Sequence, residues 1–204
     1  MTLLMVLDVE ATGGDILKHQ VVAVGFALVD LRTRRLLANE ERVVAAAYLT
    51  SWEPRCVSEF WSKHAGAQAL LAATRTGRGV APAEVAAWLH AAVVGAHAAA
   101  TAEGCTLLLG SDNLSFDLGF LDVLLSRHDL PSCKHSVDSV YLGERDVDSY
   151  ADGAQEALGR GIDVDTSDLP PHDHWPKNDA AHTALHHAAL CALVEAERGA
   201  GSSN

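Results

Sequence analysis

An apolar run that ends in two acids and a glycine pair occupies residues 3–14, and this stretch limits the possible folds more than any other part of the sequence. Residues 3–7 have no polar interruption, which is typical of a strand that is buried on both faces. Because side chains alternate along a strand, Asp8 and Glu10 are expected to lie side by side on one face. Two like charges at the end of a buried strand repel each other and lose hydration, which predicts a bound divalent cation. A strand end with two solvated acids is the alternative.

Length and composition predict one domain. The 204 residues, 49% of them hydrophobic and 21% charged, suffice for one well-buried core and are too few for two ordinary domains. We therefore expect a single domain over residues 1–198 and a disordered tail at residues 199–204. The cysteines are widely spaced and include no CxxC pair, which indicates free thiols rather than a zinc knuckle or a disulfide framework. They are Cys56, Cys105, Cys133 and Cys191.

Hydropathy and charge exclude two classes of protein. No apolar run approaches the ~20 residues that span a bilayer, and no basic segment precedes the first strand. These features predict a soluble, intracellular, cytoplasmic protein with no membrane partner. The formal net charge of -12 argues against a protein that neutralises many phosphates of a long nucleic acid. A nucleic-acid ligand would instead be held by a short end, with metal ions supplying positive charge.

Hydrophobic periodicity predicts further strands and helices after the first strand. The expected strands lie at residues 20–30, 36–47, 106–109 and 136–141, and the expected helices at residues 57–64, 68–74, 82–103, 115–127, 150–158 and 178–198. Three strands with short connections form an antiparallel meander, and the later strands follow helices. The order predicts an α/β fold with a mixed sheet flanked by helices. Residues 143–179 are rich in Asp, Gly and Pro and predict a long, partly irregular surface segment.

Two further acids are expected at the starts of helices. Asp117 falls in the first turn of a helix that follows a buried strand, where the helix dipole favours an anion. Asp179 opens the last helix, and His174 lies five residues earlier on a loop. A histidine held above a helix-start carboxylate can take a proton from a metal-bound water. An ordinary helix-start acid and a polar loop histidine are the alternatives at these positions.

Together, three short motifs resemble those of the DEDDh family of 3′–5′ exonucleases in the ribonuclease H-like superfamily. The motifs are Asp8-x-Glu10, Asn113-x-x-Phe116-Asp117 and His174-x4-Asp179. They occur in the family's order and span nearly the whole chain. Residues 58–61 and 132–135 are also similar to stretches of phage-type exodeoxyribonucleases. Two departures are Ala11, where a second threonine is frequent, and the Trp175-Pro176 pair in the spacer after His174.

The resemblance implies a ribonuclease H-like mixed five-stranded sheet, in which three antiparallel strands precede parallel ones. It implies two Mg²⁺ or Mn²⁺ ions about 4 Å apart on four carboxylates, Asp8, Glu10, Asp117 and Asp179. His174 would be the general base, and nucleoside 5′-monophosphates would leave from single-stranded 3′ ends, with DNA favoured over RNA. The residues expected to bind the substrate are Thr12, Asn113, Phe116 and Trp61. Trp61 is expected to stack on the terminal base, and packing of Phe60 and Trp61 in the core is the alternative.

Other interpretations fit the same sequence. An exoribonuclease or oligoribonuclease that trims RNA is the main one, because a contact to the 2′-hydroxyl cannot be placed from the motifs. A non-catalytic module that binds a nucleic-acid end or a protein is less favoured, since all five motif residues are present. His172 is a second candidate base, at a spacing that departs from the family. His182 and His186 form an HxxxH pair without the glutamate of a zinc-protease motif, so a solvated helix face is preferred there. The oligomeric state is left open.

Overall fold

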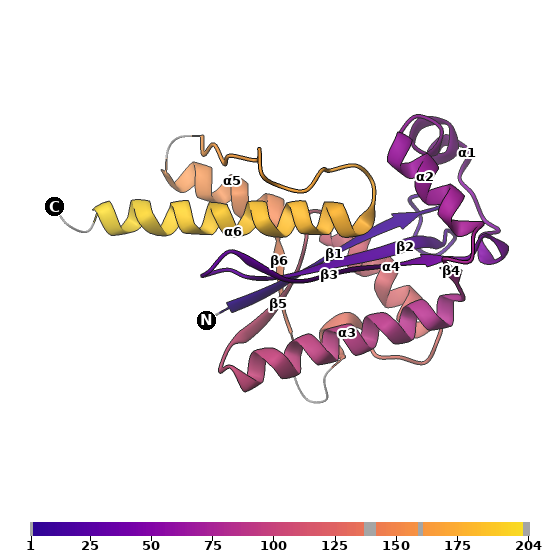
Figure 1. The fold of residues 1–204 in the computed structure, drawn as a ribbon, viewed down its shortest axis with the longest axis horizontal. Helices are drawn as coiled ribbons and strands as arrows, with labels where there is room; N and C mark the ends of the chain where they lie inside the picture. Colours follow the sequence, from indigo (N-terminus) through magenta and orange to yellow (C-terminus); the bar gives the residue numbers. More distant parts are fainter. Residues whose placement is uncertain (1, 137–141, 159–160, 202–204) are drawn as a thin grey trace.

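A computed structural model describes residues 2–136, 142–158 and 161–201, and its centre is one mixed sheet with helices on both faces (Figure 1). The strand order is β4-β3-β2-β1-β5-β6. The strands are β1 (Thr2–Ala11), β2 (Val21–Asp30), β3 (Arg35–Val44), β4 (Gly79–Val80), β5 (Thr106–Ser111) and β6 (Gly143–Asp146). The β1–β2 and β2–β3 pairs are antiparallel, and the β3–β4, β1–β5 and β5–β6 pairs are parallel. The predicted fold class is confirmed, with β4 as a sixth strand too short to leave a sequence pattern.

Strand β1 lies between β2 and β5 and is covered on both faces, which explains its uninterrupted apolar run. Met5 and Leu7 point into the larger hydrophobic core, while Leu4 and Val6 face small residues of the last helix. Asp8 and Glu10 continue the alternation of Leu4 and Val6, so both acids lie on the face that the last helix covers.

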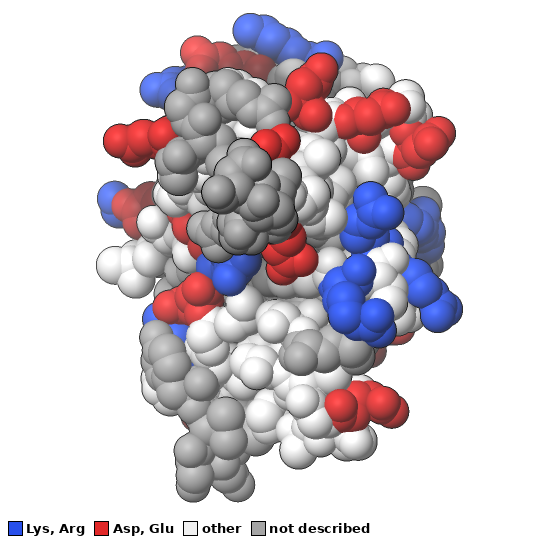
Figure 2. All heavy atoms as spheres, turned by 90° about the vertical axis from the view of Figure 1, so that its left-hand side faces the viewer, with Lys and Arg blue, Asp and Glu red and all other residues white. Residues whose placement is uncertain are grey.

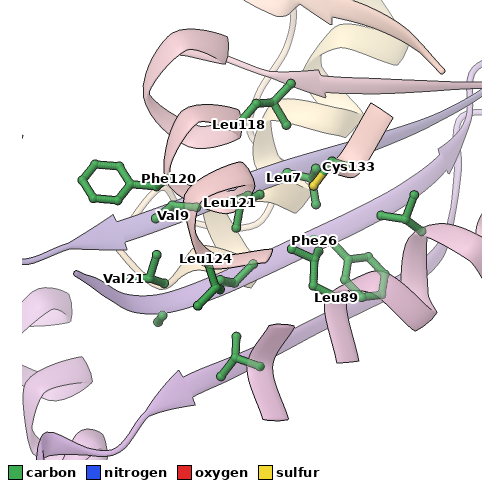
Figure 3. Close-up of a cluster of buried hydrophobic side chains, with 14 of the residues drawn as sticks. Leu7, Val9, Val21, Phe26, Leu89, Leu118, Phe120, Leu121, Leu124 and Cys133 are labelled. Atoms are coloured by element: carbon green, nitrogen blue, oxygen red, sulfur yellow. The ribbon is translucent and has the colours of Figure 1, made fainter. Parts of the chain in front are cut away.

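The larger core lies between the sheet and two helices, α3 (Pro82–Ala102) and α4 (Leu114–Ser126). Figure 3 shows Leu7 and Val9 of β1 beside Leu121 of α4, with Phe26 of β2 and Leu89 of α3 in the same cluster. These side chains are at most 6% exposed, so they fix α4 firmly against β1. The packing matters for the site, because Asp117 stands in the first turn of α4.

Helix α3 is the one helix in the described part of the chain that is long and apolar enough to cross a membrane, by length and composition. Val85, Leu89 and Val93 of this helix are fully buried in the protein core. A helix that buries one face against a sheet in this way has the environment of an ordinary core helix.

The opposite face of the sheet is covered by α6 (Pro176–Gly201), with α5 (Val147–Leu158) beside it (Figure 1). A stripe of small residues lets α6 approach the strands closely: Ala180, Ala181, Ala184 and Ala188. At the start of α6, a Cβ atom added to Gly25 of β2 would overlap the backbone of Pro176 and Lys177. This close approach brings Asp179 down to the end of β1 that carries Asp8 and Glu10.

Several boundaries differ from the sequence prediction. The third strand ends at Val44 and is followed by a short 3₁₀ turn, η1 (Ala46–Tyr48). The expected helix at 57–64 is instead α1 (Pro54–Cys56) followed by a π-helical turn, η2 (Val57–Trp61), and the next helix is α2 (Ala65–Thr74).

The expected strand at residues 136–141 falls almost entirely on 137–141, which lie outside the described residues. Ser136 follows a 3₁₀ turn, η3 (Cys133–His135), and β6 begins only at Gly143. At the C-terminus, α6 continues to Gly201, three residues beyond the expected end at Arg198, and residues 202–204 are not described. The division into a domain and a tail stays a prediction.

Candidate active site

Asp8 and Glu10 form the floor of a carboxylate cluster at the end of β1. One carboxylate oxygen of Asp8, Oδ2, is buried and has no hydrogen-bond partner in the described part of the protein. Burial raises the pKa of Asp8 well above its usual range, and the neighbouring Asp117 and Glu10 charges raise it further. Burial likewise raises the pKa of Glu10 to about 7, with His174 opposing the shift. The fold therefore holds two acids where their charges are poorly compensated.

Asp117 reaches the cluster from the first turn of α4. Its Oδ1 accepts a hydrogen bond of 3.0 Å from the backbone N–H of Val9, and its Oδ2 accepts one from the hydroxyl of Ser111. Asn113 is the N-cap of α4 and accepts a 3.3 Å hydrogen bond from the N–H of Phe116, which sets the start of the helix. The side chain of Asp117 is buried, and burial raises its pKa to about 7 despite these donors.

Asp179 enters from the first turn of α6 and also orders the loop before it. Its carboxylate accepts hydrogen bonds from the backbone N–H groups of Asp173, at 2.8 Å, and His174, at 3.1 Å. Burial raises the pKa of Asp179, while His172 and His174 oppose the shift. His174 has a positive φ of 63°, an uncommon conformation for a non-glycine residue, and the paired N–H bonds to Asp179 hold it there.

His174 overhangs the cluster at its open side. Its Nδ1 lies 3.7 Å from Oε1 of Glu10 and 4.0 Å from Oδ2 of Asp179, and its side chain is 28% exposed. Its ring packs edge-to-face against Phe60 and His64, with ring centroids 4.8 and 4.5 Å away. The adjacent Glu10 raises the pKa of His174 above its usual value. The imidazole is thus held beside the carboxylates and still reaches solvent.

His172, the discounted candidate base, also reaches the cluster. Its Nε2 lies 3.5 Å from Oδ2 of Asp179, but its side chain is 51% exposed, and among the described residues Asp179 is the one carboxylate with which it forms an ion pair. His174 contacts both Glu10 and Asp179 and is fixed by two ring neighbours, so the geometry favours His174 for a role that needs a defined orientation.

A pocket of about 400 Å³ opens beside Glu10. Phe60 and Phe116 give it aromatic walls, and the backbone at Gly13 and Gly14 forms another side. Glu53 lines the pocket and accepts a 3.0 Å hydrogen bond from the N–H of Gly14. The volume falls in the range of small-molecule and cofactor sites, so the pocket has room for a nucleotide-sized group next to the carboxylates.

Two of the predicted substrate contacts are wrong. Trp61 is 1% exposed and its indole N–H donates a 3.2 Å hydrogen bond to the carbonyl of Ala11, so it packs in the core and cannot stack on a base. Thr12 is fully buried, and its hydroxyl accepts a 2.9 Å hydrogen bond from the N–H of Gln20. Phe116 lines the pocket and Asn113 is exposed beside it, so their contacts with substrate stay predictions.

The structure adds residues that the motifs do not contain. Ser111 ends β5, and its hydroxyl both donates to Asp117 and accepts a 2.9 Å hydrogen bond from the N–H of Asn113. A serine at the end of a buried strand, two residues before the N-cap Asn113, indicates a polar residue near the start of α4. His64 contacts the ring of His174 from the start of α2, and nothing in its local sequence indicates this contact.

The donor set fits hard divalent cations. Ligand atoms of Glu10, His174 and Asp179 lie within 4.8 Å of one another, and Asp8 and Asp117 complete the carboxylates of the cluster. The unpaired Oδ2 of Asp8 is a buried acceptor that the described part of the chain leaves without a donor. Carboxylate oxygens are the ligands that Mg²⁺ and Mn²⁺ prefer, so a cation here would satisfy this atom and offset the mutual repulsion.

Comparison with known proteins finds solved structures with the same fold. No protein-family model matches the sequence, and no curated protein is found as a relative. Among solved structures, Escherichia coli exonuclease I in complex with a dT13 oligonucleotide matches with a TM-score of 0.59 and 16% identity, over 95% of this chain and 40% of that chain. The zinc-ion-bound form of the E. coli exonuclease I complex with single-stranded DNA matches with a TM-score of 0.62 and 16% identity, over 98% and 41%.

A moderately thermophilic exonuclease I from Methylocaldum szegediense matches with a TM-score of 0.59 and 14% identity, over 95% of this chain and 40% of that chain. The chain thus spans about two fifths of the length of these proteins. At such low identity the likeness concerns the fold. Over nearly its whole length, the chain has the ribonuclease H-like fold found in exonuclease I.

Proposed function

We propose that this protein is a metal-dependent 3′–5′ exonuclease that hydrolyses the terminal phosphodiester of single-stranded nucleic acid and releases nucleoside 5′-monophosphates. The observation that supports this function most directly is the unpaired, buried Oδ2 of Asp8 in a cluster of four carboxylates that includes Glu10, Asp117 and Asp179. Such a cluster is costly without a cation, and paired divalent ions on carboxylates are the usual apparatus for in-line phosphodiester hydrolysis. The fold of exonuclease I supports the same proposal.

Each residue has a distinct task in this proposal. Asp8, Glu10, Asp117 and Asp179 would hold two Mg²⁺ or Mn²⁺ ions, which supply Lewis acidity and neutralise charge at the scissile phosphate. His174, partly exposed at the rim beside Glu10, accepts the proton of the attacking water. Glu10 orients the imidazole and stabilises its protonated form after the transfer. Ser111 and the backbone of Val9 keep Asp117 pointed into the cluster.

The pocket beside Glu10 supports binding of a chain end. In the proposal, the terminal base lies between the aromatic walls that Phe60 and Phe116 provide, while the phosphodiester reaches the carboxylates. Phe60, which is partly exposed, takes over the stacking task that Trp61 cannot perform. On the face that Figure 2 shows, several basic side chains form one local group and no continuous basic stripe crosses the face, which suits a ligand that is bound by one end.

DNA is the favoured substrate, because solved structures of the same fold contain an oligonucleotide dT13 and single-stranded DNA. An exoribonuclease or oligoribonuclease with the same carboxylates is the second candidate. A non-catalytic module is disfavoured, since all four carboxylates and His174 meet at one place.

Matched 5′-labelled single-stranded DNA and RNA oligonucleotides, incubated with Mg²⁺ or Mn²⁺, test the function. A descending ladder that EDTA abolishes is expected for DNA, and Asp8→Asn should give no ladder. A stronger ladder on RNA would select the exoribonuclease. Cuts in a circular single strand would overturn the exonuclease proposal, because a circle has no 3′ end.

A further inference from the structure

Glu41 is a buried acid that the proposed mechanism does not use. It lies on β3 opposite Gly25 of β2, and Gly25 lies opposite Asp8 of β1. Because paired residues of antiparallel strands point to the same face, the side chain of Glu41 lies on the α6 side of the sheet, as that of Asp8 does. It is 8% exposed, and its Oε2 is buried without a hydrogen-bond partner in the described part of the chain. The start of α6, which lies on Gly25, separates Glu41 from the carboxylate cluster.

Two cations contact the other carboxylate oxygen of Glu41. Arg78, from the turn between α2 and β4, donates a 2.8 Å hydrogen bond to Oε1, and Nζ of Lys177 in the first turn of α6 lies 3.7 Å from the same atom. A buried carboxylate needs such partners, because an uncompensated charge is costly there. Glu41 therefore fixes the guanidinium of Arg78, which is itself 58% exposed, beside the start of α6.

Arg78 in turn covers Trp175, the residue after His174. Its guanidinium carbon lies 5.3 Å from the centroid of the indole ring, within the range of a cation–π interaction. The backbone of Trp175 links the loop to α6. Its N–H donates a 3.2 Å hydrogen bond to Oδ1 of Asp173, and its carbonyl accepts one of 3.0 Å from the N–H of Asp179. A fixed indole therefore restrains the backbone on both sides of Trp175.

His174 needs this support because its backbone conformation is unfavourable. Its φ of 63° is uncommon for a non-glycine residue, and such a conformation persists only where the surrounding structure restrains it. The hydrogen bond from its N–H to Asp179 supplies part of the restraint. The indole of Trp175, packed under Arg78, supplies a further part from the C-terminal side.

We propose that Glu41, Arg78 and Trp175 are positioning residues, which hold His174 over the carboxylate cluster without contacting the reacting atoms. This inference rests on the proposed function for the role of His174 as general base. Glu41 orients Arg78, and Arg78 restrains the indole of Trp175. The Trp175-Pro176 pair, which departs from the family pattern in the spacer after His174, thereby receives a structural task.

Amide hydrogen exchange of the metal-free protein, in EDTA and without substrate, tests the restraint independently of any nuclease activity. The proteins compared are the wild type, Arg78→Gln, Arg78→Lys and the control Arg75→Gln. Arg75 is exposed at the end of α2, three residues before Arg78, and its side chain forms no ion pair with any residue that the structure describes. Melting curves verify that each variant is folded.

The amides of Asp173 and His174, which donate to Asp179, should exchange about tenfold or more faster in Arg78→Gln than in the wild type. Lysine keeps a cation that can lie over the indole, so Arg78→Lys should restore most of the protection. Arg75→Gln should match the wild type. Unchanged exchange in Arg78→Gln would overturn the proposal. Equally fast exchange in Arg75→Gln would also overturn it, because the effect would then not depend on the contact with Trp175.

Steady-state hydrolysis of a 5′-labelled oligonucleotide tests whether the restraint acts through His174. Arg78→Gln should lower kcat by about tenfold and leave KM within about threefold of wild type, since a displaced base slows the chemical step rather than weakening binding. Arg78→Lys should recover most of the lost kcat. In the His174→Ala background, Arg78→Gln should cause no further loss, because no base is left to position.

A raised KM with an unchanged kcat would make Arg78 a contact to substrate phosphate and would overturn the positioning role. A full further loss of kcat in the His174→Ala background would also overturn it, because Arg78 would then act through another group. If the wild type leaves 3′ ends intact, the proposed function fails, while the exchange experiment still decides whether Arg78 holds the loop.

Discussion

His174 combines three properties of a general base: partial exposure, a fixed ring and contact with a carboxylate. His174→Ala should lower the rate of 3′-end hydrolysis by about 10²–10⁴-fold, the usual contribution of a positioned base. The rise in melting temperature that Mn²⁺ causes should stay close to that of the wild type, since the four carboxylates remain. Single-turnover rates and melting curves measure the two effects.

His172→Ala is the matched control for that experiment, because His172 contacts the same Asp179 carboxylate but is more exposed and contacts neither Glu10 nor Phe60 in the described structure. Its rate should stay within a few-fold of wild type. A large loss in His172→Ala together with a small one in His174→Ala would reverse the assignment of the base.

The pKa of His174 in the metal-free protein depends on the charges beside its ring. Its pKa should lie above the model-peptide value of about 6.5, because the adjacent Glu10 and Asp179 carboxylates favour the imidazolium. NMR titration of its ring proton in EDTA measures this value. Glu10→Gln should move the pKa back down, since it removes the partner that contributes most to the shift.

At the scale of elements, the loop that carries His174 is held by close packing against α2. A Cβ atom added to Gly66 would overlap the carbonyl oxygen of Asp173, the residue before His174. Gly66→Ala should therefore displace the loop and lower the turnover rate by about tenfold or more, because a shift near 1 Å can cost catalysis more than that. Steady-state kinetics, with folding checked by melting, measure the effect.

Gly95→Ala is the control for Gly66→Ala. Gly95 lies in the middle of α3, where an added Cβ meets nothing within 4 Å, so alanine should stabilise the helix by about 1 kcal/mol. Activity should not change. An unchanged rate in Gly66→Ala would mean that the loop adapts and that its packing does not position His174.

The sequence best predicted the site residues that lie at the end of a strand or at the start of a helix. Strand alternation predicted that Asp8 and Glu10 are neighbours, and helix starts predicted the positions of Asp117 and Asp179. That the four carboxylates meet was implied by the resemblance of the three motifs to the DEDDh family. The orientation of Trp61 could not be predicted, because a π-helical turn, rather than a regular helix, turns its ring into the core.

Long-range contacts account for the other differences. Ser111 supports Asp117 because the end of β5 lies against the first turn of α4; its local sequence marks a strand end but does not identify Asp117 as its partner. A pocket of about 300 Å³ lies between α6 and residues 166–172, so His182 and His186, which line it, are half-buried instead of lying on the solvated helix face expected from the sequence. Local periodicity alone cannot distinguish such a face from a solvated one.

For the whole molecule, the carboxylate cluster links stability to pH and to metal. Glu10 and Asp117 have folded-state pKa values of about 7, above the usual carboxyl range near 4. The folded protein then binds more protons than the unfolded chain between about pH 4 and pH 7, so metal-free stability should fall as pH rises through this window. Melting temperatures in EDTA across these pH values measure the slope. A flat or rising profile would contradict the cluster.

Saturating Mg²⁺ or Mn²⁺ should reverse this loss near neutral pH, because the cations bind only the folded cluster. The free energy of unfolding should rise by about 3–4 kcal/mol at 100 to 1,000 times Kd.

In Asp117→Asn the amide oxygen can still accept a hydrogen bond from the N–H of Val9, so the start of α4 keeps its anchor while one charge is removed. The metal-free variant should melt at or above the wild-type temperature at pH 7, yet lose activity and most of the Mn²⁺-induced shift. Ser115→Ala, an exposed substitution in the same helical turn, should leave all three measurements unchanged. If Asp117→Asn melted well below wild type in EDTA, Asp117 would be a structural helix-start acid, and repulsion among the four carboxylates would not be what the cations relieve.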